Sequence, residues 1–273
     1  MKKRIDGILI QKGLCSQRGA KNFFKKNEIF VNGEKINDNK FLVQTGDRIH
    51  VKKDFKSLKA DSQKLSAGKE KSTSFEFTVP ADWYIVMHKP AHFVCSHFSD
   101  SHKTVYTLIN NSLLSQIEAS GQTLHTVGRL DADTEGLLIL TTDGNLSHFL
   151  ASPESKIEKT YFARLKNPVP AESQLEYAKK FSSGVILPAE KKSPEETSAP
   201  AVLKWISATE CEVTVTEGKF HEVRRLFLAV GNEVEYLKRI SFGNLALSSQ
   251  NLAPGEYKIL RDLPTDLVET NCF

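Results

Sequence analysis

The sequence lacks the features that define several large classes of protein. Its four cysteines are far apart and form no C-x-x-C pair, so neither a disulfide framework nor a zinc ribbon is expected. No window approaches the roughly 18 consecutive apolar residues of a membrane span. The N-terminal segment has no small-residue cleavage site of the kind that ends a secretory signal. We therefore expect a cytoplasmic protein that does not associate with a membrane.

Common nucleotide and metal motifs are also missing. Neither G-x-x-x-x-G-K-[ST] nor G-x-G-x-x-G occurs, so nucleotide-dependent chemistry has no support. The stretch DADTEG at 131–136 begins like a calcium loop, but Thr142 stands where the closing glutamate is required. Three histidines and a cysteine at 88–97 could be ligands, but Pro90 interrupts their helical spacing. We expect no metal site and no nucleotide cofactor.

The positive charge is concentrated near the N-terminus. Residues 1–60 contain 15 lysines and arginines against 6 acidic residues, a net charge of +9. The rest of the chain contains 22 against 27, a net charge of −5. A basic module joined to a mildly acidic body predicts that the module binds a polyanion.

The basic segment has the pattern of a small folded module. Ser16 is a predicted N-cap for a helix through QRGAKNFFKK, on which Arg18, Lys21 and Lys25 share one side. EIFVNGEKI predicts a hairpin around Asn-Gly, and FLVQTGDRIHV predicts a further strand pair. The three cations could form a plain solvated face. The order of the elements, however, resembles the RNA-binding module of ribosomal protein S4 over residues 2–52, which implies that these cations contact RNA.

The remaining chain predicts a second, larger domain. Residues 59–75 are rich in lysine and serine and are typical of a linker, which leaves 1–58 as the module and 76–273 as the second domain. Apolar or alternating segments there are separated by turns and by helical patterns, and they predict an α+β domain with a mixed, largely antiparallel sheet. These segments are WYIVMHKP, GLLILTT, TYFARL, CEVTVTEG and EVEYLKRISF.

The stretch GRLDADTEG, residues 128–136, places charged residues directly before an apolar run. Asp131 and Asp133 would share one face of an extended segment, as the two carboxylates of a glycosidase could. Alternatively they could form a turn and a cap that pair with Arg129. Spacing alone leaves both interpretations open.

The same stretch matches the G-R-L-D-x-x-[ST]-x-G signature of the pseudouridine synthases. The whole chain is similar to their RsuA-type branch, which modifies ribosomal RNA. The resemblance implies an enzyme that isomerises uridine to pseudouridine without a cofactor. The family often has Asn at His88 and Gln-Val-Lys at 222–224, and neither departure touches Asp131. Further matches, in chain order, are HKPAHFVCS, SHFLASP, EKTYFARL, EGKFHEVRRLFLAVGNEVEYLKRISFG and LAPGEYKIL.

By position, the resemblance implies that Asp131 is the essential carboxylate, Tyr161 the active-site tyrosine and Arg224 the basic partner. The reaction needs an ionised carboxylate that acts as a nucleophile or as a base. An arginine beside it would keep it charged in a dry pocket. Tyr161 could instead be a core tyrosine, and Lys89 could bind phosphate or brace the site. The residues expected to bind substrate RNA are Arg129, Lys89, Arg225, Arg18, Lys21 and Lys25.

The resemblance also suggests a substrate. The segments FVCS and LASP favour small-subunit (16S) ribosomal RNA over the large-subunit (23S) RNA that related enzymes modify. The expected partner is ribosomal RNA or the assembling small ribosomal subunit, and the protein is expected to be a monomer. The alternatives are a synthase for 23S RNA and a ribosome-assembly protein that binds RNA without catalysis.

Overall fold

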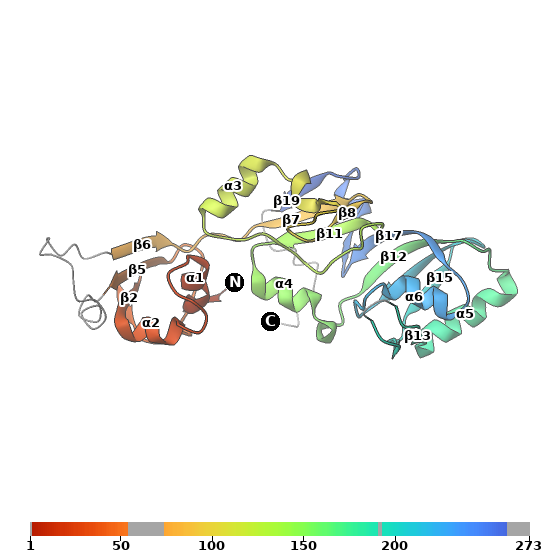
Figure 1. Ribbon diagram of the computed structural model, residues 1–273, viewed down its shortest axis with the longest axis horizontal. Helices are drawn as coiled ribbons and strands as arrows, with labels where there is room; N and C mark the ends of the chain where they lie inside the picture. Colours follow the sequence, from red (N-terminus) through yellow and green to blue (C-terminus); the bar gives the residue numbers. More distant parts are fainter. Residues whose placement is uncertain (1, 54–73, 191–192, 261–273) are drawn as a thin grey trace, which may run out of the picture. The chain divides into compact units, whose positions relative to one another are not determined.

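The structure is a computed structural model that describes residues 2–53, 74–190 and 193–260 (Figure 1). The chain divides into two compact units. The first comprises Met1–Asp82 with Gln116–Thr123, and the second comprises Trp83–Ser115 with Leu124–Phe273. No helix in the described ranges is long and apolar enough to cross a membrane.

The N-terminal unit is a four-stranded antiparallel sheet with two short helices on one face. The strand order is β3-β2-β5-β6, and a second small sheet pairs β1 with β4. Alternate residues of the central strands are buried against the helices, which is the period-2 pattern of a half-covered sheet. The elements are β1 (Lys3–Arg4), α1 (Ile5–Gln11), α2 (Ala20–Lys26), β2 (Asn27–Val31), β3 (Glu34–Ile36), β4 (Leu42–Val43), β5 (Arg48–Lys53) and β6 (Ser74–Thr78).

The predicted hairpin is present in this unit. β2 and β3 are joined by Asn32 and Gly33, which both have positive φ (51° and 89°), as a type I′ turn requires. The start of α2 differs from the prediction, since its N-cap is Gly19. The Ser16 side chain instead accepts a hydrogen bond from the Gly19 N–H (3.1 Å), so it closes the turn that precedes the helix.

Two strands of the unit also differ from the sequence-based expectation. β4 pairs with β1, whereas the sequence predicted that it pairs with β5. β6, which the sequence placed at the end of the linker and the start of the second domain, pairs with β5 along five residues. The N-terminal unit therefore continues past the predicted linker. Most of that linker, residues 59–73, lies outside the described residues.

The second unit is built on a nine-stranded mixed sheet. Its main path is β15-β16-β12-β17-β11-β7-β19, with β10 paired to β11 and β18 to β17. Among the described pairs of this sheet, β11 with β17 is parallel and the others are antiparallel, which confirms the predicted fold class. The strands of the sheet are β7 (Tyr84–Lys89), β10 (His125–Thr126), β11 (Glu135–Thr141), β12 (Lys159–Leu165), β15 (Val202–Trp205), β16 (Glu210–Val215), β17 (Val234–Phe242), β18 (Leu245–Ala246) and β19 (Tyr257–Leu260).

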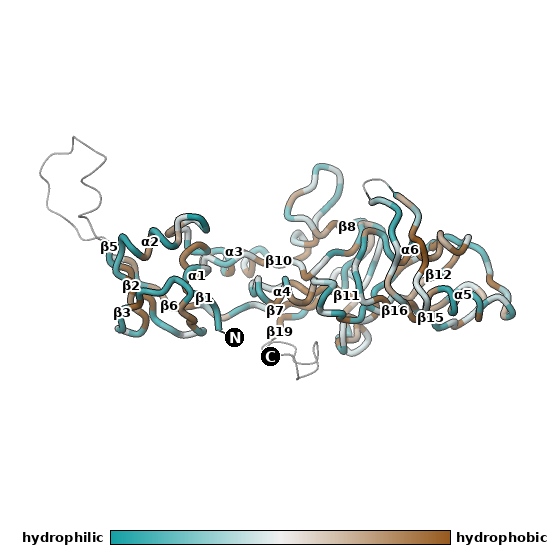
Figure 2. Tube along the Cα trace, turned by 90° about the horizontal axis from the view of Figure 1, so that it is seen from below, coloured by the Kyte–Doolittle hydropathy of each residue, from teal (hydrophilic) through white to brown (hydrophobic). Residues whose placement is uncertain are grey.

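Helices of this unit cover the sheet and complete two apolar cores. One core packs α5 and α6 against β12, β15 and β16, and the other packs α4 against β7 and β11. Hydrophobic residues run along β12 and α6 in Figure 2. The remaining elements are α3 (Asn111–Ala119), α4 (Gly144–Ala151), α5 (Ala171–Ser183), α6 (Glu222–Ala229), the short strands β8 (Phe93–Val94), β9 (Lys103–Thr104), β13 (Ile186–Leu187) and β14 (Glu196–Thr197), and the 3-10 turns η2 (Val105–Leu108), η3 (Pro153–Ser155) and η4 (Ser248–Gln250).

Candidate active site

The GRLD turn connects β10 to β11 and is held in place by a buried lysine. Lys89, the last residue of β7, is 0% exposed. Its Nζ donates to the carbonyl oxygens of Asp131 (2.9 Å), Ala132 (3.3 Å), Thr134 (2.8 Å) and Pro90 (3.1 Å). An ammonium group that is surrounded by carbonyl oxygens fixes the path of the backbone that carries them. Lys89 therefore braces the turn, which is one of the two roles expected from the sequence. Its burial leaves no room for a phosphate contact.

Further contacts hold the same turn on both sides. The His92 N–H donates to the carbonyl oxygen of Ala132 (2.6 Å), and the Leu130 N–H donates to the Sγ of Cys95 (3.4 Å). At the C-terminal end of the signature, Gly136 has φ +115° and packs directly on the backbone of β17. A Cβ at this position would lie 2.2 Å from the carbonyl oxygen of Arg239. The close packing of β11 on β17 thus requires a glycine at the final position of the signature.

The turn presents Asp131 to a cavity of about 270 Å³. The Asp131 side chain is 34% exposed, so its carboxylate is accessible from solvent. The other walls come from the end of β16, from the loop before α6 and from α6 itself. Residues that line the cavity include Gly128, Arg129, Asp131, Thr134, Tyr161, Lys219, Phe220, His221 and Glu222.

Tyr161 enters this cavity from β12, opposite Arg239 on β17. Burial raises the pKa of the Tyr161 hydroxyl, and the neighbouring Arg239 guanidinium offsets part of that effect. The phenol therefore stays protonated at neutral pH and can donate a hydrogen bond or offer its ring as a stacking surface. Arg239 is itself buried, and its Nε donates to the carbonyl oxygen of Leu137 (2.7 Å).

A histidine lies beside the Asp131 carboxylate. His221 Nε2 lies 3.6 Å from Asp131 Oδ1. The other ring nitrogen, Nδ1, is 3.0 and 3.1 Å from the two carboxylate oxygens of Glu190. The His221 ring also stacks on Phe220, with ring centroids 3.8 Å apart. The imidazole is therefore held between two carboxylates and against an aromatic ring.

Arg224 does not occupy the place that the sequence predicted. Its Nη2 forms an ion pair with Asp133 Oδ2 (2.9 Å), and its Nη1 donates to the carbonyl oxygen of Val234 (2.8 Å). The expected neighbour of Asp131 thus pairs with the second carboxylate of the same turn. Since Asp133 lies between Ala132 and Thr134, whose carbonyl oxygens Lys89 holds, this ion pair links the turn to α6.

Arg225 also differs from the expectation that it contacts RNA. The side chain is 1% exposed and donates to Glu196 Oε1 and to the carbonyl oxygens of Pro188, Pro194 and Phe220. These contacts place the guanidinium inside the protein, where it ties α6 to the segment that leads to β14. In the sequence, Arg225 lies off the apolar helical stripe that Val223, Leu226, Phe227 and Val230 form. That pattern does not reveal the distant acceptors.

The other expected RNA-binding residues are on the surface. Arg129 is exposed and lines the cavity beside Asp131. In the N-terminal unit, Arg18, Lys21 and Lys25 are all exposed, the first just before α2 and the other two on it. The sequence places Ala20, Phe23 and Phe24 on the side of this helix opposite the cations. The structure confirms this, because Phe23 and Phe24 pack against the core of the unit.

The sequence analysis missed three residues that shape the site. Arg239, His221 and Glu190 come from β17, the N-cap of α6 and the segment after β13. Glu190 lies far from the signature in the sequence, and nothing in its surroundings marks it. His221 lies within a quoted family match, and its left-handed φ of 48° is a backbone feature that the sequence does not reveal. In the described part of the chain, no group of three or more His, Cys, Asp or Glu side chains could hold a metal.

The buried Glu222 makes stability depend on pH. The side chain is 6% exposed, and burial raises the pKa of its carboxyl group from about 4.5 to about 7. Between these values the folded state retains a proton that the unfolded chain releases, so stability falls as pH rises. Glu222→Gln should remove this decline. The variant should match the wild type near pH 4.5 and exceed it by up to about 3 kcal/mol above pH 7.

Urea unfolding between pH 4.5 and 8 measures this difference. Glu235→Gln is a matched control because Glu235 is exposed on β17. Its difference from the wild type should not change with pH. A Glu222→Gln curve that runs parallel to the wild type over the whole range would contradict the prediction.

Comparisons with known proteins identify the family of each part of the chain. The family model described as RNA pseudouridylate synthase matches residues 83–229, and the S4 domain model matches residues 3–49. The chain belongs to the RNA pseudouridylate synthase family, with an S4 domain at its N-terminal end. This result confirms the resemblance that the GRLD signature indicated.

Individual relatives cover most of the chain. A ribosomal small subunit pseudouridine synthase A from Vibrio cholerae is 42% identical over 73% of this chain and 82% of its own length. The protein of the same name from Vibrio parahaemolyticus is 33% identical over 97% of this chain and 99% of its own length. A crystal structure of a pseudouridylate synthase aligns with a TM-score of 0.57 and 29% identity over 94% of this chain and 95% of that one.

Proposed function

We propose that this enzyme isomerises a specific uridine to pseudouridine in small-subunit (16S) ribosomal RNA, with Asp131 as the catalytic carboxylate. The observation that carries the proposal is the position of Asp131. Its carboxylate is accessible at a 270 Å³ cavity, on a turn whose backbone Lys89 braces. The relatives named above are small subunit pseudouridine synthases, which favours that RNA as the substrate.

The reaction is that of the pseudouridine synthase family, and the groups around the cavity are suited to it. The bond between uracil and ribose breaks, the base turns, and carbon five forms the new bond to the sugar, with no oxidation and no external acceptor. Asp131 acts as a nucleophile or as the base that removes a ribose proton. Tyr161, which is kept neutral by burial, stacks on the uracil or donates a hydrogen bond while the base turns. Arg129 at the cavity wall is placed to contact a phosphate of the bound nucleotide.

His221 would set the position of the Asp131 carboxylate. Its Nδ1 faces the Glu190 carboxylate and its Nε2 faces Asp131, so the doubly protonated ring can donate to both. In this arrangement His221 takes over the neighbouring position that the sequence had given to Arg224. Arg224 contributes indirectly, because its pair with Asp133 holds the turn against α6.

A uridine inside folded RNA must leave its stack to reach the cavity, at a cost of a few kcal/mol. Phosphate contacts from the N-terminal unit would offset that cost. Replacing Arg18, Lys21 and Lys25 together by glutamine should weaken RNA binding. It should also make the plot of log affinity against log salt concentration less steep, by the amount expected for the loss of up to about three phosphate contacts. The measurement is fluorescence anisotropy with a fragment of 16S RNA at several salt concentrations.

The control for this triple variant replaces Lys166, Lys179 and Lys204 of the other unit by glutamine. This control removes the same amount of positive charge, because all three lysines are exposed. An equal loss of slope in both triple variants would indicate a nonspecific effect of net charge. It would count against a phosphate-binding role for the three residues of the N-terminal unit.

The activity itself is tested with purified full-length protein on 16S RNA, 23S RNA and small-subunit particles, followed by mapping of pseudouridines. We expect one new pseudouridine in the small-subunit RNA, and we further propose that the protein acts as a cytoplasmic monomer on the RNA or on an assembling particle. Modification of 23S RNA alone would replace the proposed substrate. RNA binding without any modification would favour a ribosome-assembly protein.

A further inference from the structure

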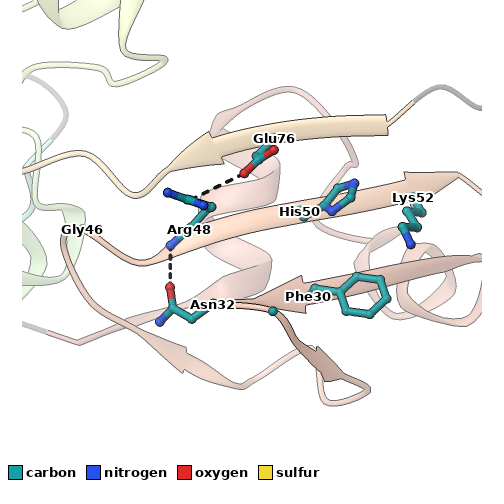
Figure 3. A pocket seen from close by; sticks show the side chains of 8 residues that line it. Phe30, Asn32, Gly46, Arg48, His50, Lys52 and Glu76 are labelled. Atoms are coloured by element: carbon teal, nitrogen blue, oxygen red, sulfur yellow. Dashed lines mark hydrogen bonds and ion pairs between the residues drawn. The ribbon is translucent and has the colours of Figure 1, made fainter.

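One face of the N-terminal sheet is left open by the two helices of its unit. The buried residues of β2 and β5 point toward the helices, and the residues between them point the other way. Figure 3 shows Phe30, Arg48, His50, Lys52 and Glu76 side by side on this second face. They come from three neighbouring strands and line a shallow depression of about 630 Å³. We call this surface the open sheet face.

Two aromatic rings form the centre of the open sheet face. Phe30 and His50 are direct cross-strand partners in the β2–β5 register, and their ring centroids are 5.9 Å apart. Both side chains belong to half-buried residues, so each ring retains solvent-accessible surface. Lys52 Nζ lies 5.1 Å from the centroid of the Phe30 ring. The Lys52 ammonium lies over the ring, so a nucleic acid base would take its place on Phe30 while the lysine contacts the following phosphate.

The charges on this face favour an anion. Arg48 and Lys52 flank the rings along β5. Lys35, the partner of Phe30 in β3, forms an exposed ion pair with Glu28 (2.6 Å), so the three cations of this face outnumber its two carboxylates, Glu28 and Glu76. Arg48 has a carboxylate neighbour in Glu76 at 3.5 Å, but these side chains are 72% and 57% exposed. An exposed ion pair of this length is weak, so a phosphate can replace the carboxylate at little cost.

The same composition argues against a protein partner. A stable protein interface has an apolar centre surrounded by polar residues. Of the residues that line the depression, Phe30 alone is apolar apart from glycines, and the others carry charge or hydrogen-bonding groups. Unpaired RNA fits better, because bases supply flat rings and the backbone supplies negative charge.

We propose that the open sheet face binds an unpaired segment of the substrate RNA. One base stacks on the Phe30 and His50 rings, and Lys52 and Arg48 contact the adjacent phosphates. This surface is separate from Arg18, Lys21 and Lys25, because α2 packs on the opposite face of the sheet. The N-terminal unit thus has two RNA contacts, one for phosphates alone and one for single-stranded bases.

The test uses the full-length protein and a fluorescein-labelled single-stranded RNA of about 12 nucleotides, with a duplex of the same sequence as a comparison. Phe30→Leu removes the ring but keeps an apolar side chain. It should lower affinity for the single strand by about tenfold, leave the salt slope unchanged and leave duplex binding unchanged. Lys52→Gln should lower the salt slope by about 0.7.

Phe98→Leu is the matched control, since Phe98 is a 77% exposed phenylalanine of the other unit. It should bind both RNAs like the wild type. Thermal unfolding of each variant reports whether the fold is kept, and Phe30→Tyr, which restores a ring, should rescue binding. The proposal would be overturned if Phe30→Leu bound the single strand as tightly as the wild type, or if it lost equal affinity for single strand and duplex. A change in sedimentation that reveals a protein contact at this face would also overturn it. Absence of pseudouridine formation by the wild type would reject the proposed function and leave this binding test valid.

Discussion

Asp131→Asn should abolish pseudouridine formation, with a rate at least about 10³-fold below the wild type. The amide is nearly the same size as the carboxylate but can act neither as a nucleophile nor as a base. The turn should keep its shape, because Lys89 and His92 hold its backbone through main-chain atoms and not through the Asp131 carboxylate. RNA binding and thermal stability should therefore stay close to those of the wild type. Single-turnover assays with mapped RNA measure the rate.

Asp133→Asn provides the control within the same turn. Asp133 is exposed, pairs with Arg224 and does not line the cavity. We expect this variant to retain most of its activity, because Lys89 still holds the backbone of the turn, and to lose only the stabilisation from a partly exposed ion pair, about 1 kcal/mol or less. If both variants lost activity equally, or if Asp131→Asn lost RNA binding and stability together with activity, the carboxylate would have a structural role instead of a catalytic one.

Gly136→Ala should destabilise the protein by about 3 kcal/mol or more. The new Cβ would lie 2.2 Å from the carbonyl oxygen of Arg239 and 2.6 Å from its nitrogen, and both are backbone atoms. The φ of +115° adds strain for any residue with a side chain. Relief requires β11 and β17 to separate, which would displace the turn and the partner strand of Tyr161. Urea unfolding measures the loss, and activity should fall with it.

Gly144→Ala is the matched control for this substitution. Gly144 is the first residue of α4, has no left-handed φ, and leaves open space where a Cβ would go. Alanine should be neutral there or stabilise the helix by up to about 1 kcal/mol. Similar stabilities for Gly136→Ala and the wild type would show that the strand pair adjusts without cost.

Local patterns predicted the parts of the fold that depend on nearby residues. The Asn32-Gly33 dipeptide located the hairpin, and the apolar runs located β7, β11 and β17. The position of β6 could not be predicted in this way. Its pairing with β5 joins segments that lie on either side of a polar stretch, so only the assembled sheet reveals it.

Sequence patterns likewise located individual residues of the candidate site but not the contacts between them. The signature located Asp131, and family resemblance located Tyr161, and both line one cavity. Helical periodicity showed that Arg224 and Arg225 lie off the apolar stripe of α6, but it contains no information about acceptors on other elements. Asp133 and Glu196, which hold these two arginines, become visible only in three dimensions.

The parallel pairing of β11 with β17 determines when the candidate active site can assemble during synthesis of the chain. Its register joins Gly136 to Arg239, so β11, which can pair with β7 and β10 early, gains its third neighbour, β17, only after most of the chain has been synthesised. Contacts between such distant segments form slowly, because the entropy cost of closing a long loop comes before any stabilising contact is made. While the chain is still being synthesised and β17 is missing, Asp131 is therefore attached to an incomplete sheet. Activity should begin only once synthesis has passed β17.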